Sequence, residues 1–305
     1  MSKPASKSRT RGPEPRKVAL HARDVAFNWA GLPLRWIPGE PFASHFINVL
    51  HLLLPEGERW FVKNFVEVLP LIKDEKLFEE VLGFIGQEGM HANAHQGVID
   101  YFDANGLDTR ELIGEIEIVF QRLLGDRDLT GAAREEWLIE KVALIAAIEH
   151  MTAFLGNWIL NSPALDAAGA DPQMLDLLRW HGAEEVEHRN VAFDLFTHLD
   201  GRYHRRIRTY LIAVVGIFYI WLRSASYLIE HDATLDQRVR SGLVTGVIPG
   251  WVRGARQGIL PGFEGMVLPL LRYFSPAYHP SREGSTSQAV AYLAKSPAAM
   301  AADAG

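Results

Sequence analysis

Two copies of one helical unit, Glu-x-x-His, constrain this chain more than any other feature of its sequence. The units are Glu88 with His91 and Glu185 with His188, and they lie 97 residues apart (185 − 88). Because positions three and four apart share one face of an α-helix, each unit presents a carboxylate and an imidazole side by side. The fold must therefore either expose both pairs to water or face them toward something that neutralises them.

Long helical segments separated by Pro, Gly and Asp make up most of the sequence. We expect helices over the following ranges: 42–54, 56–72, 74–104, 108–125, 131–161 and 171–199. Asn105 and Gly106 end one of them, and Asp171 followed by Pro172 is typical of a helix start. No alternating strand pattern is present between 40 and 230, so the sequence predicts an all-α fold.

Composition excludes several classes of function. The chain has no cysteine, which excludes disulfides, thiolate metal sites and cysteine nucleophiles. A net charge of −6 gives no electrostatic reason to expect a nucleic-acid partner. Any metal or proton chemistry then depends on the carboxylates and on the 12 histidines.

The pattern divides the chain into four parts. We expect a disordered basic tail over 1–24, a helical bundle over 25–200, an apolar helical extension over 201–280 and a weakly ordered tail over 281–305. The first segment lacks the apolar run of a secretory signal, so we expect a cytoplasmic protein.

An uncharged apolar run, YLIAVVGIFYIWL, occupies 210–222 and follows a basic segment. As a helix it would cover only about 20 Å, less than the roughly 30 Å of a hydrocarbon core. We favour a helix buried against the bundle; a peripheral membrane contact through 202–271 and a true membrane span are the alternatives. A homodimer is also left open.

The face that carries the second unit holds further titratable groups. His181, Glu184, Glu185 and His188 share one helical stripe, whereas Glu187 points away from it. Glu184 and Glu187 are interpreted mainly as surface salt-bridge partners, with a role for Glu184 beside the metal ligands as the alternative.

In dinuclear carboxylate bundles, two helices supply Glu-x-x-His and two others supply one Glu each. Glu149 lies in the apolar segment LIAAIEHMTAFLG, 18 residues before the turn expected near 167, and Glu185 lies 18 residues after it. Antiparallel packing would bring the two carboxylates level. By the same reasoning the partner of Glu88 falls near 58, so Glu58 is preferred over Glu67.

The sequence thus predicts a metal site that holds two ions. Its ligands are Glu58, Glu88, His91, Glu149, His181, Glu185 and His188, and the candidates for residues behind these ligands are His95, Glu184 and His150. Oxygen and imidazole ligands suit iron, with manganese or zinc as alternatives. Bridging between two cations would remove the repulsion among buried carboxylates. The opposing interpretation, solvated helix faces, fits an isolated Glu-x-x-His better than two matched copies, and it stays open as the alternative.

Four segments, LPEGERWFV, GFIGQEGMHANAH, IEHMTAF and WHGAEEVEHRNVAFDLF, resemble bacterial proteins catalogued as predicted metal-dependent hydrolases, over about 25–280. The order of the seven ligands also resembles that of ferritin-like di-iron arylamine N-oxygenases, in which a third histidine precedes the second unit as His181 does here. This resemblance implies a ferritin-like helical bundle, here with extra N-terminal and C-terminal helices.

Three functions remain in competition. The first is a di-iron oxidase or oxygenase that uses O₂ on an apolar, lipophilic or amine small molecule. The second is a hydrolase that uses a metal-activated water, since no Ser-His-Asp arrangement is recognisable. The third is a metal-binding bundle without catalytic activity. Because seven ligands leave few open positions on two metals, we favour the first.

Overall fold

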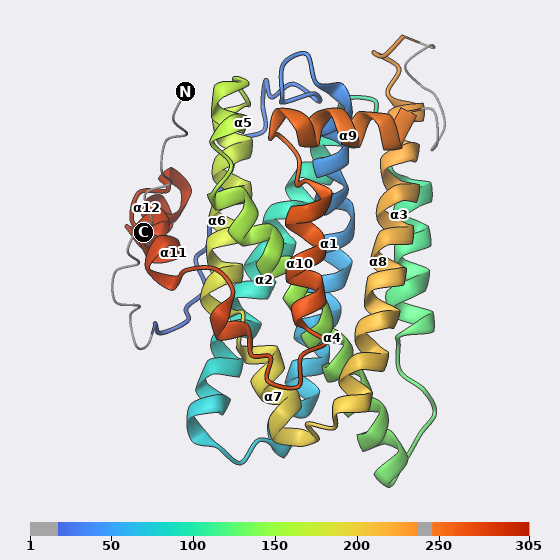
Figure 1. The fold of residues 1–305 in the computed structure, drawn as a ribbon, viewed down its shortest axis with the longest axis vertical. Helices are drawn as coiled ribbons and strands as arrows, with labels where there is room; N and C mark the ends of the chain where they lie inside the picture. Colours follow the sequence, from blue (N-terminus) through green and yellow to red (C-terminus); the bar gives the residue numbers. More distant parts are fainter. Residues whose placement is uncertain (1–17, 237–245, 305) are drawn as a thin grey trace, which may run out of the picture.

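The computed structural model describes residues 18–236 and 246–304, and within these ranges the chain forms helices and no strand, which confirms the all-α prediction. Five long helices run side by side (Figure 1): α1 Pro41–Val68, α2 Glu75–Ala104, α4 Gly131–Leu160, α6 Pro172–His188 and α8 Tyr203–His231. The shorter helices are α3 Arg110–Glu117, α5 Pro163–Ala167, α7 Val191–Leu199, α9 Ile248–Gln257, α10 Phe263–Arg272, α11 Thr286–Leu293 and α12 Pro297–Asp303. A π-helical segment, Ile118–Leu123, follows α3.

Two helix pairs, α1 with α2 and α4 with α6, make the most extensive contacts of the bundle. Local sequence sets where their second members begin: the Asp74 side chain accepts a hydrogen bond from the backbone of Leu77, and Asp171 caps α6 directly before Pro172. Helix α8 packs on α4 and α1, and α9 crosses one end of the bundle (Figure 1).

The buried apolar side chains form two clusters at different levels of the bundle. One includes Trp36 and Trp180, and the other includes Phe65 and Phe84. Between them lies a layer of buried carboxylates and imidazoles, so the polar groups have apolar packing on both sides.

Two predicted helix boundaries are wrong. Helix α1 continues through Pro55, where a break was expected, because α1 is packed against α2 and this packing outweighs the backbone hydrogen bond that proline removes. Conversely, the helix expected over 171–199 ends at His188. Arg189 turns inward there and donates hydrogen bonds to the carbonyl of Val186, which the helix end leaves free, and to the carbonyl of Pro280.

The two predicted tails also differ from the structure. Residues 1–17 lie outside the described residues, but Arg23, which we had placed in the basic tail, is buried in an ion pair with Glu184. The weakly ordered tail expected over 281–305 instead forms α11 and α12, which pack on α6 through buried residues such as Ala289 and Leu293. Small side chains permit this close packing, which a hydrophobicity pattern alone did not indicate.

Helix α8 is long and apolar enough to cross a membrane by length and composition, and the apolar run 210–222 lies within it. Helix α8 packs against α1 and α4, but within 210–222 only Tyr210 and Ala213 are buried, so the expectation of a buried helix holds only in part. A hydrogen bond between His45 and Asp232 ties the C-terminal end of α8 to α1. The opposite face of α8 exposes apolar side chains.

Helices α4 and α6 approach closely at Gly156 and Gly182. A Cβ atom on Gly156 would lie 2.5 Å from the carbonyl oxygen of Gly182, closer than packing allows. We expect Gly156→Ala to lower the free energy of unfolding by about 1–3 kcal/mol, because the helices must separate. Chemical denaturation of the metal-free protein measures this change.

The matched control is Gly114→Ala in α3, where a Cβ would meet nothing within 4 Å. That substitution should leave stability unchanged or raise it by up to about 1 kcal/mol, as alanine favours helix. Equal effects of the two substitutions would show that the close approach is not needed.

Candidate metal centre

All seven predicted ligands lie together in the polar layer, and each is buried. They come from four helices: Glu58 from α1, Glu88 and His91 from α2, Glu149 from α4, and His181, Glu185 and His188 from α6. Six of these residues lie inside their helices, and His188 is the last residue of α6, so the helical backbone sets the height of each side chain. We call these seven residues the carboxylate–histidine cluster.

One half of the cluster surrounds His188. Its Nε2 lies 3.2 Å from a carboxylate oxygen of Glu88, 3.4 Å from one of Glu149 and 3.5 Å from one of Glu185. This half therefore joins α2, α4 and α6, and the predicted level pairing of Glu149 with Glu185 corresponds to the observed arrangement.

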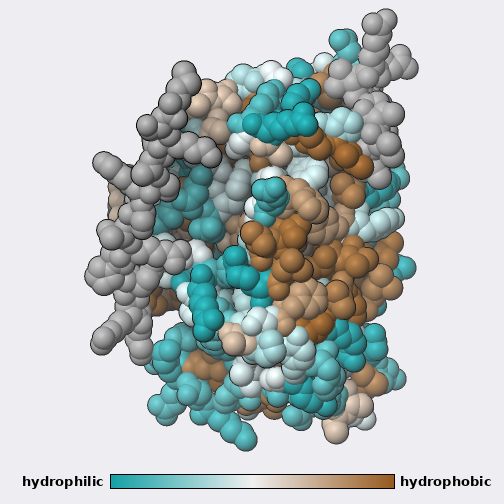
Figure 2. Space-filling view, viewed as in Figure 1, coloured by the Kyte–Doolittle hydropathy of each residue, from teal (hydrophilic) through white to brown (hydrophobic). Residues whose placement is uncertain are grey.

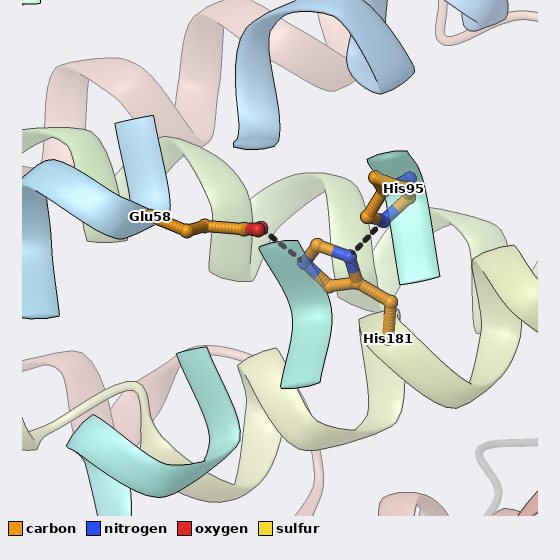
Figure 3. Close-up of side chains that lie close together, drawn as sticks. All are labelled: Glu58, His95 and His181. Carbon is orange, nitrogen blue, oxygen red and sulfur yellow. Dashed lines mark hydrogen bonds and ion pairs between the residues drawn. The ribbon is translucent and has the colours of Figure 1, made fainter. Parts of the chain in front are cut away.

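The other half involves His91, His181 and Glu58. His91 Nδ1 lies 3.6 Å from Glu185, and His181 Nε2 lies 2.8 Å from Glu185 and 3.8 Å from Glu58. Figure 3 shows Glu58 and His95 on either side of the His181 ring. Four groups of three residues are close enough to share an ion, and Glu58, Glu88 and Glu185 each belong to two of them. Of these three, Glu88 and Glu185 have partners in both halves of the cluster.

The hydrogen bonding of the cluster fits metal ions. Its polar atoms without a hydrogen-bond partner are both oxygens of Glu58, both oxygens of Glu88, Nδ1 of His91, one oxygen each of Glu149 and Glu185, and Nε2 of His188. Leaving a buried polar group unsatisfied costs about 1–3 kcal/mol, and a charged one costs more. Cations bound at these inward-facing atoms would satisfy all of them at once.

The outer nitrogen of each unit's histidine is held by the opposite unit. His91 Nε2 lies 2.9 Å from Glu184, the residue before Glu185, and His188 Nδ1 lies 3.0 Å from the side-chain oxygen of Gln87, the residue before Glu88. Each imidazole thus donates its outer N–H to an oxygen and turns its other nitrogen inward, as metal-bound histidines do.

Further residues hold these supports in place. Arg23 donates to Glu184 at 2.5 Å, and Trp180 donates to the same carboxylate at 3.2 Å. Gln87 in turn donates to Glu187 at 3.3 Å. Arg23 also lies 3.5 Å from Glu187. Glu184 and Glu187 are therefore both salt-bridge partners of Arg23, but their side chains are buried behind the histidines, so their interpretation as surface groups is wrong.

Without cations the buried charges disturb one another. Burial raises the pKa of Glu58 and Glu88 well above the usual carboxyl value, and repulsion from neighbouring glutamates adds to this. Burial, with repulsion from Glu185, raises the pKa of Glu149 to about 7. Burial lowers the pKa of His91 to about 3.

Glu185 and His188 behave in the opposite sense. Burial alone would raise the pKa of Glu185, but His188 and His181 hold it well below the usual value. Likewise, the surrounding carboxylates, Glu185 foremost, overcome burial and raise the pKa of His188 well above that of a free histidine. In the metal-free protein the central charge of the cluster is thus an ion pair of these two residues.

The remaining candidates lie at different distances from the cluster. His95 contacts His181, with 2.5 Å between Nε2 and Nδ1, and its other nitrogen lies 2.7 Å from His51 (Figure 3 shows the first pair). His150 lies elsewhere, bonded to the carbonyl of Pro269 and to Tyr278, so it does not support a ligand. Glu67, which we had set aside, pairs with Arg134 outside the cluster.

Sequence reasoning missed three residues at this site. His51 lies seven positions before Glu58, the spacing that also separates His181 from His188, so helical periodicity could have indicated it. Gln87 directly precedes a predicted ligand, as Glu184 does. Arg23 gave no signal, because its partner lies 161 residues away.

An apolar cavity of about 440 Å³ adjoins the cluster. Among the polar side chains that line it are Glu58, Glu88, Glu149, His181 and Glu185, which belong to the cluster. Most of the rest of the lining is aliphatic or aromatic and comes from α1, α4, α8, α9 and α10. The cavity thus connects the cluster to the outer helices, within the size range of small-molecule sites.

The fold and the cluster define the class: an all-α bundle with buried glutamate and histidine groups that could hold metal ions. Comparison with protein families agrees, since the model described as "Predicted metal-dependent hydrolase" matches residues 21–284. The chain belongs to this family. No curated protein and no solved structure shows significant similarity to it.

The ligand assignment predicts a sharp difference between two glutamates. We expect Glu149→Ala and His188→Ala each to lose at least one bound metal, because each removes a group that faces the centre. Glu67→Ala should keep the full metal content, since Glu67 lies outside the cluster. Elemental analysis of the purified variants measures this, and an unchanged content in His188→Ala would refute the assignment.

The pKa shifts also predict how the stability of the metal-free protein depends on pH. Glu149 keeps its proton up to about pH 7 in the folded state, whereas the unfolded chain releases it near 4.5. The pKa values of Glu58 and Glu88 are also raised in the folded state. The stability that these three protonated carboxyl groups contribute is therefore lost as the pH rises through their pKa values in the folded protein.

Buried histidines such as His91 act oppositely, but only below their unfolded pKa of 6.5. We therefore expect the melting temperature of the metal-free protein to fall above about pH 6.5. Bound metal ions should abolish this decline, because they replace the protons, and Glu149→Gln should reduce it. If the melting temperature of the metal-free protein instead increased with pH in the range above 6.5, the pKa shifts would be contradicted.

Proposed function

We propose that this protein is a dinuclear, di-iron enzyme that uses O₂ to oxidise an apolar small molecule. The observation that carries the proposal is the position of the carboxylate–histidine cluster at the inner end of an apolar cavity. Four carboxylates and three imidazoles without sulfur suit iron, with manganese or zinc as alternatives.

The helical arrangement supports two ions rather than one. One helix supplies Glu58, the next supplies a Glu-x-x-His unit, the third supplies Glu149 and the fourth supplies a second unit, which is the ligand order of ferritin-like di-metal bundles. Glu88 and Glu185 stand between the two halves of the cluster, where carboxylates can bridge two ions.

The protein's own residues prepare the site in three ways. Gln87 and Glu184 fix the outer nitrogens of the histidines and so aim their inner nitrogens. Apolar side chains exclude water from the cavity, which strengthens every electrostatic interaction inside it. The cavity walls hold an apolar substrate against the cluster. Two ferrous ions, when bound, would supply two of the four electrons that reduce O₂; the substrate C–H bond that becomes C–OH would supply the other two, and an external electron donor would restore the ferrous state.

Hydrolysis is the second candidate, and the family description favours it. Two metal ions can activate a water and polarise a carbonyl or phosphoryl group. The cavity gives less support to this chemistry, because among its lining residues outside the cluster the polar side chains are few, such as Thr152, which donates to the backbone of Glu149. An ester or phosphate would find little there to hold its polar atoms.

The deciding experiment measures metal content and the response to O₂. Protein loaded with Fe(II) without oxygen should hold about two irons per chain and consume about one O₂ for each pair, with a new visible absorption band. His188→Ala should lose this response and Glu67→Ala should retain it. Hydrolysis would instead be established by three results together. The protein would hold two zinc or manganese ions, its iron-loaded form would be inert to O₂, and it would cleave esters or phosphates only with metal bound.

A further inference from the structure

One side of the molecule exposes many apolar side chains. Brown, hydrophobic residues gather in Figure 2 over the region where Figure 1 shows α10 and α8. The exposed members on α8 are Leu211, Ile212, Val215, Phe218 and Tyr219; those on α9 are Ile248 and Val252; those on α10 are Phe263, Leu268 and Leu271. We call this set the apolar face. Apolar surface gathered in this way marks a site of interaction.

Helices α8 and α10 are apolar on both sides at this face. Met266, Val267 and Leu270 of α10 line the cavity, while Leu268 is 64% exposed on the outside, and no residue of α10 is fully buried. On α8, Ile217 lines the cavity and Val215 is 69% exposed. A helix that is apolar all round is normally surrounded by apolar material, either protein or lipid.

The cavity opens within this face. Phe218, Ile248 and Phe263 each line the cavity and are also exposed, from 38% to 64%. A continuous apolar surface therefore runs from the outside of α8, α9 and α10 to the carboxylate–histidine cluster. A substrate that enters by this route has to leave an apolar environment or be stripped of water at the opening.

The segment that carries the face is basic, although the chain as a whole is acidic. The described residues 202–236 and 246–272 contain eight arginines against four aspartates or glutamates, a formal charge of +4 (8 − 4), in a chain of net charge −6. Arg208 at one end of the exposed stripe of α8 and Arg253 on α9 are more than half exposed. Each pairs with one carboxylate, Glu140 and Glu40 respectively, and its exposed guanidinium has further N–H groups for a second anionic partner. Tyr219, an amphipathic side chain of the kind enriched at membrane interfaces, is 70% exposed.

We propose that the apolar face docks on the surface of an anionic lipid bilayer, and that the cavity takes a hydrocarbon-like substrate directly from the lipid. The substrate class rests on the proposed function, whereas docking depends only on the face. Apolar side chains enter the acyl boundary, and arginines around them meet anionic headgroups. A bilayer fits better than a rigid protein partner, because a fluid occupant covers the opening and still delivers substrate through it.

Vesicle flotation of the full-length, metal-loaded protein tests docking. We expect binding to phosphatidylcholine vesicles that contain phosphatidylglycerol, weaker binding to phosphatidylcholine alone, and weakening by salt. The double variant Val215→Glu, Leu268→Glu alters the face without touching the cavity lining or the cluster. It should bind anionic vesicles at least about tenfold more weakly, since it loses buried apolar area and adds repulsion.

A control alters two exposed apolar residues elsewhere: Val66→Glu, Leu82→Glu, which lie on α1 and α2 and are 50% and 45% exposed. This variant should bind vesicles as the unaltered protein does. Metal content and helix content, measured for both double variants, show whether each is folded.

Three results would overturn docking. The first is no binding to anionic vesicles, and the second is an equal loss of binding in both double variants. The third is a dimer, seen by sedimentation, that the double variant Val215→Glu, Leu268→Glu dissociates. That result would assign the face to a second copy of the chain. The O₂ response of soluble protein is measured separately. If the protein binds vesicles but does not react with O₂, the docking proposal stands and the proposed oxidation is wrong. If it reacts with O₂ but does not bind vesicles, only the docking proposal is wrong.

Discussion

Mutual repulsion among buried carboxylates is the constraint on which the rest of this structure depends. Glu58, Glu88, Glu149 and Glu185 lie in the middle of the bundle between two apolar clusters. No described lysine or arginine pairs with any of these four. Such an arrangement is expensive for a folded chain unless protons or metal ions balance the charge. The pKa values of three of the glutamates are raised, so in the metal-free protein bound protons take the place of the cations and reduce the negative charge.

Hydrogen bonds between the two Glu-x-x-His units hold the cluster together against this repulsion. Gln87 holds the histidine of the second unit, and Glu184 holds the histidine of the first, so neither unit is complete without the other. The two supports are not alike, because Gln87 is neutral and Glu184 is a carboxylate paired with Arg23. The imidazole of His91 therefore meets a more negative partner than that of His188, and the two halves of the cluster offer metals different environments.

The family description and the chemistry that we propose agree on the need for metal and differ on the reaction. The family match establishes a metal-dependent family over most of the chain, and the buried glutamate and histidine groups provide places for the metal. The reaction itself depends on what reaches the cluster. Here the approach is an apolar cavity whose walls include α8 and α10, and the outer sides of these helices are also apolar. Cluster, cavity and face together are the basis of our proposal that the substrate is lipophilic.

The sequence by itself determined the all-α fold and which glutamates and histidines would meet. Helical periodicity sets which side chains share a face, and equal distances from a turn set which carboxylates lie level, as for Glu149 and Glu185. Both are local properties. Only the tertiary structure decided the continuity of α1 through Pro55, the end of α6 at His188, the burial of Arg23 against Glu184 and the place of His150 away from the cluster. These depend on packing and ion pairs between residues distant in the chain, whose energies exceed local preferences and leave no periodic signal in the sequence.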